Sequence, residues 1–123
     1  MRYISILLVT LIANWSCDSA NDDISQNDLD SQLNEIRAMV ENETCTDSSE
    51  WLFVGLGAKP CGGPTDYIAY STNMDVGTFL ELVERYNQDV RAFNEENGLI
   101  SDCAIEPAPS AIVCEDGRAV LVY

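Results

Sequence analysis

The sequence predicts an α+β fold: a small antiparallel sheet of four or five strands covered by one long helix, with a shorter N-terminal helix and two disulfides. Two observations predict it. Apolar residues follow helical spacing over residues 28–42 and 75–97. Short apolar and aromatic runs, bounded by glycine, proline or Asp-Gly, occupy most of the remaining chain and are typical of strands. Helices and strands in this order favour an antiparallel sheet with a helix on one face.

The first sixteen residues have the pattern of a bacterial signal peptide. Arg2 supplies one positive charge, and residues 4–13 form a ten-residue apolar stretch. A membrane-spanning helix needs about 20 apolar residues, whereas a secretory signal needs only about half that length. The alternative is a buried N-terminal helix or strand, but strongly polar sequence follows the stretch directly. We therefore predict export.

Cys17 lies where a bacterial lipoprotein carries its lipid. The pair Ser16-Cys17 fits the lipobox, in which the cysteine becomes the new N-terminus and its thiol receives a diacylglyceryl group. Asn14 and Trp15 depart from the leucine and the small residue that this pattern prefers. We expect anchoring in the bacterial cell envelope, with the outer membrane or the cell surface favoured. Secretion without lipid is the alternative.

The charge of the chain restricts its partners. The 123 residues include 21 acidic and 6 basic side chains, a net charge of −15. Such a charge repels the phosphates of nucleic acids, so we predict no nucleic-acid partner. Residues 17–27 combine acidic side chains with almost no apolar content, which predicts a disordered tether between the lipid and a single domain at residues 28–123.

Two helices are expected in that domain. The first, over residues 28–42, has Asp28 as its N-cap and places Leu29, Leu33, Ile36 and Val40 on one face. The second runs from an N-cap at Asp75 to Gly98 just beyond its end. Its apolar stripe, which should cover the sheet, consists of Val76, Phe79, Leu80, Val83, Tyr86, Val90 and Phe93.

Two pairs of strands are expected around the long helix. Residues 51–56 and 67–71 flank a loop, residues 57–66, that contains three glycines and two prolines. Residues 111–114 and 118–123 flank Asp116-Gly117, a hairpin signal. A short fifth strand is expected over residues 99–103, followed by an irregular loop with Pro107 and Pro109.

The cysteine count supports both export and lipidation. Five cysteines are present, and lipid on Cys17 leaves an even number: Cys45, Cys61, Cys103 and Cys114. In an oxidising compartment these indicate two disulfides, for which three connectivities exist. We predict Cys45–Cys61 and Cys103–Cys114, because each bridge then closes a local segment and the long helix separates the pairs. Each such bridge should contribute about 3 kcal/mol in the chain-entropy model.

Residues 45–123 resemble a group of small, uncharacterised bacterial lipoproteins. The resemblance is carried by Cys-Gly-Gly-Pro at residues 61–64 and by Tyr-Ile-Ala-Tyr-Ser at residues 67–71, within a recurring order of cysteines. It implies a small exported disulfide domain and no particular activity.

The sequence offers little for catalysis. It contains no histidine, which removes the usual nucleophile pairs and the commonest metal ligand. Cys61 has no second cysteine at redox-motif spacing, and residues 55–60 lack the Gly-Lys-Ser/Thr ending of a phosphate loop. No carboxylate pair stands out, and the acidic stretches lack the glycine and terminal glutamate of a calcium loop. We predict no catalytic residue, no metal site and no cofactor; an enzyme acting through carboxylates is a distant third choice.

Two classes of function remain. The first is a lipid-anchored binding or structural module whose partners are the membrane and an envelope or secreted protein. The alternative is an inhibitor of an exported enzyme, such as a protease, that presents a disulfide-flanked loop. The candidate binding loop comprises Lys59, Pro60, Gly62, Gly63 and Pro64. A second candidate is residues 104–111, and either segment could instead be a purely structural turn.

Overall fold

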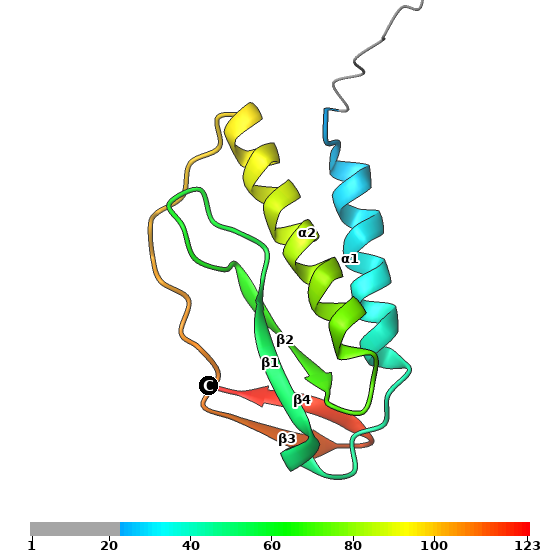
Figure 1. Ribbon diagram of the computed structural model, residues 1–123. Helices are drawn as coiled ribbons and strands as arrows, with labels where there is room; N and C mark the ends of the chain where they lie inside the picture. Colours follow the sequence, from blue (N-terminus) through cyan, green and yellow to red (C-terminus); the bar gives the residue numbers. More distant parts are fainter. Residues whose placement is uncertain (1–22) are drawn as a thin grey trace, which may run out of the picture.

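The computed structural model describes residues 23–123, so the predicted signal peptide, Cys17 and most of the predicted tether lie outside the described residues (Figure 1). The helices are α1 (Gln26–Glu41), α2 (Val76–Glu96) and a short 3₁₀-helix η1 (Ser48–Glu50). The strands are β1 (Trp51–Leu56), β2 (Asp66–Ser71), β3 (Ala111–Glu115) and β4 (Arg118–Val122). The predicted α+β class is confirmed.

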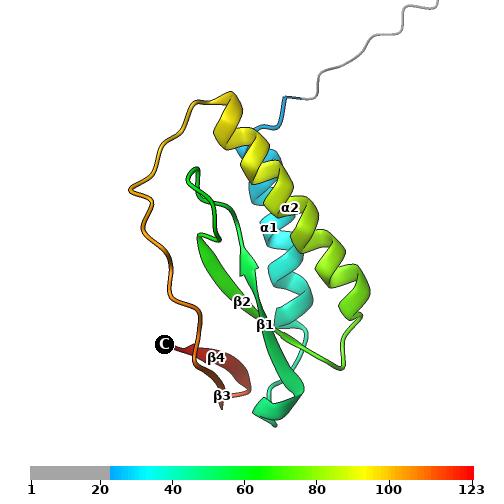
Figure 2. The same ribbon diagram turned by 60° about the vertical axis from the view of Figure 1, so that its left-hand side comes forward.

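The four strands form two separate antiparallel hairpins, so the prediction of one sheet with four or five strands is wrong. In the first hairpin Trp51 lies opposite Ser71, and in the second Ala111 lies opposite Val122. Figure 2 shows three layers: the two helices, the β1–β2 hairpin, and the β3–β4 hairpin on its other side. The C-terminal hairpin therefore stacks on the first one instead of extending it.

The reason for the stacking is that the β1–β2 hairpin is apolar on both faces. Successive residues of a strand point to opposite faces. On one face Leu56 and Tyr70 join Ile36, Phe79 and Val83 of the helices in the main core. On the other face a second cluster gathers Cys45, Trp51 and Ala69 with Ile112, Cys114, Ala119 and Leu121. Each face needs its own covering layer, and β3–β4 covers the second.

Helix α1 begins two residues earlier than predicted. Its N-cap is Ser25, whose hydroxyl accepts a hydrogen bond from the Asp28 backbone N–H, while the Asp28 carboxylate accepts one from the Ser25 N–H at 2.9 Å. Asp28 is thus the third helical residue of a capping box and not the N-cap. The ordered domain consequently begins inside the segment predicted as tether.

Helix α2 agrees with its prediction at both ends. The Asp75 side chain accepts from the Thr78 N–H, and Gly98 follows the C-cap residue with a φ of +59°. Phe79 and Val83 of the predicted stripe are buried, whereas Leu80 is exposed. None of the described helices is long and apolar enough to cross a membrane.

Residues 99–110 form a strap without helix or strand, so the predicted fifth strand is not present in this part of the described chain. In Figures 1 and 2 the strap descends from the end of α2, passes the β1–β2 loop and reaches β3. Near its end Pro109 is buried.

The disulfides are Cys45–Cys114 and Cys61–Cys103, so the predicted pairing is wrong although all four predicted cysteines are bridged. The physical reason is the length of α2. Its 21 residues span about 30 Å, so α2 runs back along β2 and ends near the β1–β2 loop. The returning strap then brings Cys103 to Cys61, and β3 brings Cys114 to Cys45.

Candidate binding site

The β1–β2 loop, residues 57–65, is fixed to α2 by two asparagines. The Asn87 side chain accepts a hydrogen bond from the Gly57 N–H at 2.7 Å and donates one to the Gly55 carbonyl at 3.2 Å. Two helical turns later, buried Asn94 donates to the Ala58 carbonyl at 2.8 Å. Because residues seven apart share a helix face, both amides hold the same side of the loop. The sequence interpretation assigned no role to either residue.

The glycines of the candidate loop have a local structural role. Gly62 and Gly63 have φ values of +102° and +80°, a region that glycine occupies without steric cost. Their backbone closes a tight turn, in which the Gly62 N–H donates to the Lys59 carbonyl and the Lys59 N–H to the Gly63 carbonyl, both at 2.9 Å. The loop therefore keeps one shape, with Pro60 exposed and Pro64 half-buried.

Two links join this loop to the strap. One is the Cys61–Cys103 disulfide. The other is Lys59, whose ammonium donates to the Ala104 carbonyl and to Glu106 Oε1, both at 2.8 Å. The Lys59 side chain is only 13 % exposed, and this residue of the candidate binding loop links the loop to the strap within the protein. The two candidate segments, residues 57–66 and 104–111, thus meet in a single cross-linked unit.

The strap exposes two large aliphatic side chains on either side of Cys103. Ile100 is 93 % exposed and Ile105 is 92 % exposed, more than any other large hydrophobic residue of the described chain. Burying one such side chain is worth about 1.5–3 kcal/mol, and folding gains almost none of this here. The sequence predicts a strand at Ile100 and includes Ile105 in the second candidate segment, residues 104–111, but it singles out neither side chain as exposed.

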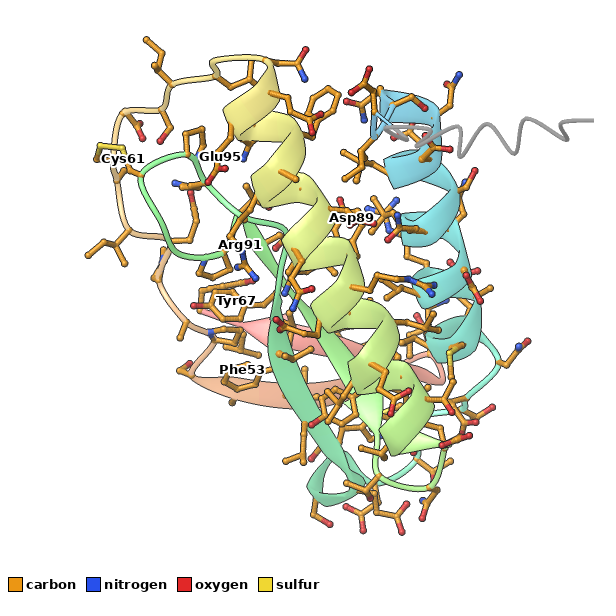
Figure 3. All side chains as sticks on the ribbon, turned by 45° about the horizontal axis from the view of Figure 1, so that its top comes forward. Phe53, Cys61, Tyr67, Asp89, Arg91 and Glu95 are labelled. Carbon is orange, nitrogen blue, oxygen red and sulfur yellow. A yellow bond between two sulfur atoms is a disulfide. The ribbon has the colours of Figure 1, made fainter. Side chains whose placement is uncertain are left out.

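A small hollow of about 160 Å³ lies between the loop and the C-terminal half of α2. Pro60, Gly62, Arg91, Glu95 and Leu99 are among the residues that line it. In Figure 3, Arg91 and Glu95 project from α2 toward the loop that carries Cys61. Arg91 is 51 % exposed and lies 3.5 Å from Glu84. The hollow is smaller than the roughly 300–1,000 Å³ of typical small-ligand pockets.

No known family model, curated protein or solved structure matches this chain. The resemblance to the Cys-Gly-Gly-Pro lipoproteins accordingly stays a prediction, and so does lipid on Cys17. The function has to be argued from the geometry of the loop and strap.

All four cysteines of the described chain are bridged, so residues 23–123 offer no free thiol. Within the same residues no group of three or more cysteine and carboxylate side chains is arranged to hold a metal. What the unit does present is a fixed backbone, two exposed isoleucines and a surrounding surplus of carboxylates.

Proposed function

We propose that this chain is a non-catalytic binding module of the bacterial cell envelope, anchored by lipid on Cys17, that docks a protein partner with its strap. One observation supports the proposal above all: Ile100 and Ile105 are exposed on a segment that a disulfide and the Lys59 ion pair tie to the loop. The two disulfides of the described chain suit an extracytoplasmic compartment.

The cross-links make exposed isoleucines useful as anchors. A segment without secondary structure normally loses conformational freedom when it binds, and that loss weakens the complex. Here much of the ordering has occurred on folding, because Cys61 and Lys59 fix the strap at Cys103, Ala104 and Glu106. The strap therefore loses less conformational entropy on docking than a free segment would, so more of the free energy gained by burying the two isoleucines remains.

The acidic residues of the strap and its surroundings restrict which partners can bind there. Asp102 and Glu106 lie in the strap, Glu95 and Glu96 lie at the end of α2, and the whole chain carries −15. A second copy of this chain or an anionic lipid surface would be repelled. The proposed partner is a protein whose apolar pocket accepts isoleucine and whose rim is neutral or basic.

The test is capture of a partner from the native envelope by the tagged, lipidated protein. We expect the double variant Ile100→Ser/Ile105→Ser to lose the captured protein, because both anchors are removed. The matched control is Leu52→Ser, which removes an exposed leucine from β1. Capture that is equal for all three proteins, or absent from the wild-type sample, would contradict the proposal.

A second candidate function is inhibition of an exported protease. It is favoured by the form of the strap, an irregular segment held by a disulfide at its centre with exposed side chains on both sides. No lysine or arginine occurs between Arg91 and Arg118, so the strap suits a protease pocket for aliphatic side chains and not one for basic residues. Inhibition of elastase-like but not trypsin-like enzymes, lost in the double isoleucine variant, would identify this function. Absence of inhibition from both enzyme classes would remove it.

A further inference from the structure

A second hollow lies between the strap, the start of β2 and the end of the described chain. Its volume is about 340 Å³, within the range of small-ligand pockets. Tyr67, Tyr123 and Pro107 provide its apolar walls, and Asp66 and Glu106 line it as well. Neither exposed isoleucine contributes to it. The hollow therefore combines aromatic rings with carboxylates at a place that the proposed docking function does not use.

The ring of Tyr67 is held in place from one side. Phe53 packs against it edge-on, with ring centroids 5.8 Å apart and planes at 84°. Figure 3 shows the two residues on the β1–β2 hairpin, below the loop that carries Cys61. The Tyr67 backbone N–H also donates to Asp66 Oδ1 at 2.7 Å, which fixes the orientation of that carboxylate at the start of β2.

The charged groups around this hollow are predominantly acidic. Partial desolvation, and then Asp66, Tyr67 and Glu106, raise the pKa of the Tyr123 hydroxyl, which places both carboxylates within electrostatic reach of that ring. Glu106 is paired with Lys59, but Asp66 has no ion-pair partner among residues 23–123. An anion would be repelled here. A metal dication would lack ligands, because Ca²⁺ takes six to eight oxygens and the hollow offers two carboxylates.

We propose that this hollow binds an organic ammonium ion, with its alkyl groups against Tyr67, Tyr123 and Pro107 and its charge balanced by Asp66, the lining carboxylate that no ion pair of the described residues neutralises. Aromatic faces attract such cations through the ring quadrupole, and alkyl substituents on nitrogen fill apolar walls that a hydrated metal ion would not. A ligand with a trimethylammonium group is the best probe, because that group combines a single positive charge with a wholly apolar surface.

The experiment is an NMR titration of the full chain, kept in an uncharged maltoside detergent that contains no ammonium group. The probe is choline, and the control ligand is 3,3-dimethyl-1-butanol, which has the same shape with carbon in place of the charged nitrogen. We expect saturable shifts at the amides of Asp66, Tyr67 and Tyr123 with choline only. Equal shifts with the neutral alcohol, or none with choline, would overturn the proposal.

Substitutions of the lining residues test whether choline binds in this hollow. Asp66→Asn and Tyr67→Leu should each weaken choline binding about tenfold, because the first removes the balancing charge and the second removes a cation–π contact. Tyr123→Leu is a second aromatic variant in case Tyr67→Leu does not fold, since Tyr123 is 63 % exposed. The matched control is Glu115→Gln on β3, which removes a carboxylate outside the hollow. Unchanged affinity in all three site variants would contradict the assignment.

Two further measurements are needed. The first distinguishes a lipid headgroup from free choline as the source of the cation, and the second distinguishes choline binding from the proposed docking function. Vesicles of phosphatidylcholine and of phosphatidylglycerol distinguish a lipid headgroup from free choline, and competition by free choline would show that both occupy one site. The double isoleucine variant should keep its full affinity for choline, because its side chains do not line the hollow. Choline binding by a wild-type protein that captures no partner, or whose capture is unchanged by the isoleucine substitutions, would leave this inference standing while the docking function fails.

Discussion

At the scale of single residues, glycine and proline content predicted where the candidate binding loop lies but not which side chains hold it in place. Glycine and proline content placed the loop between the two strands, as the structure confirms. Lys59 belongs to the candidate binding loop, and its ammonium is paired within the protein with Glu106. The role of Asn87 and Asn94 was not predictable from spacing, because nothing in a helical stripe reveals which backbone carbonyl will lie opposite an amide.

Asn94 gives a direct test of that role. We expect Asn94→Leu to lower the free energy of unfolding by about 1–3 kcal/mol, because the buried Ala58 carbonyl loses its donor. Urea denaturation measures the change. The control is Gln88→Ala, an exposed amide on the same helix whose loss should cost less than about 0.5 kcal/mol. Equal effects of the two substitutions would mean that the bond to the loop contributes nothing.

At the scale of secondary-structure elements, helical periodicity predicted both α-helices and turn signals predicted both pairs of strands, but neither predicted how the two hairpins stack. The run Trp-Leu-Phe-Val-Gly-Leu in β1 is continuously apolar, a pattern of strands that are covered on both faces. That signal was present in the sequence. The sequence analysis did not predict the third layer, because a pattern of apolar residues shows that a face is buried without showing which element covers it.

The helix caps make the start of α2 sensitive to acid. Hydrogen bonds from Thr78 to Asp75 lower the pKa of this carboxyl below its usual 3.8. A lowered folded-state pKa means that the ionised cap stabilises the fold above pH 3.8 and that this contribution is lost as the pH falls through the folded value. We expect the melting temperature to decrease below about pH 4, and less steeply in Asp75→Asn, which keeps a cap without a titrating group. Identical pH profiles would show that Asp75 does not contribute.

At the scale of the whole molecule the two disulfides are nested, since Cys61–Cys103 lies within the segment that Cys45–Cys114 closes. Their sequence separations are 42 and 69 residues. Closing loops of that size stabilises by about 4 kcal/mol each in the chain-entropy model, more than the local bridges first predicted. Connectivity depends on where the chain returns after α2, and no local pattern in the sequence reports that path.

Proteolysis distinguishes nested from local bridges. Trypsin cleavage after Arg85 and Arg91 in α2 should leave the N-terminal and C-terminal parts joined until a thiol reductant is added. Non-reducing and reducing mass spectrometry of the digest measures this. Release of two separate, internally bridged parts without reductant would restore the local pairing and contradict the structure.

Lipid on Cys17 is tested by mass. The protein extracted from membranes should be heavier than chain 17–123 by its acyl groups, and Cys17→Ser should abolish both the added mass and the membrane association. A wild-type product that starts beyond Cys17, or one that carries no added mass, would rule out the anchor.

Tension applied between a lipid on Cys17 and a partner on the strap would follow the shortest covalent path through the chain. That path runs along residues 17–45, crosses to Cys114 through the sulfur atoms and returns along β3 to the strap, so it bypasses the chain between Cys45 and the strap. Helix α2 and strand β2 lie in the bypassed part. The load would fall on α1 and β3, while the whole β1–β2 hairpin, α2 and the aromatic hollow's Tyr67 stay out of the line of force.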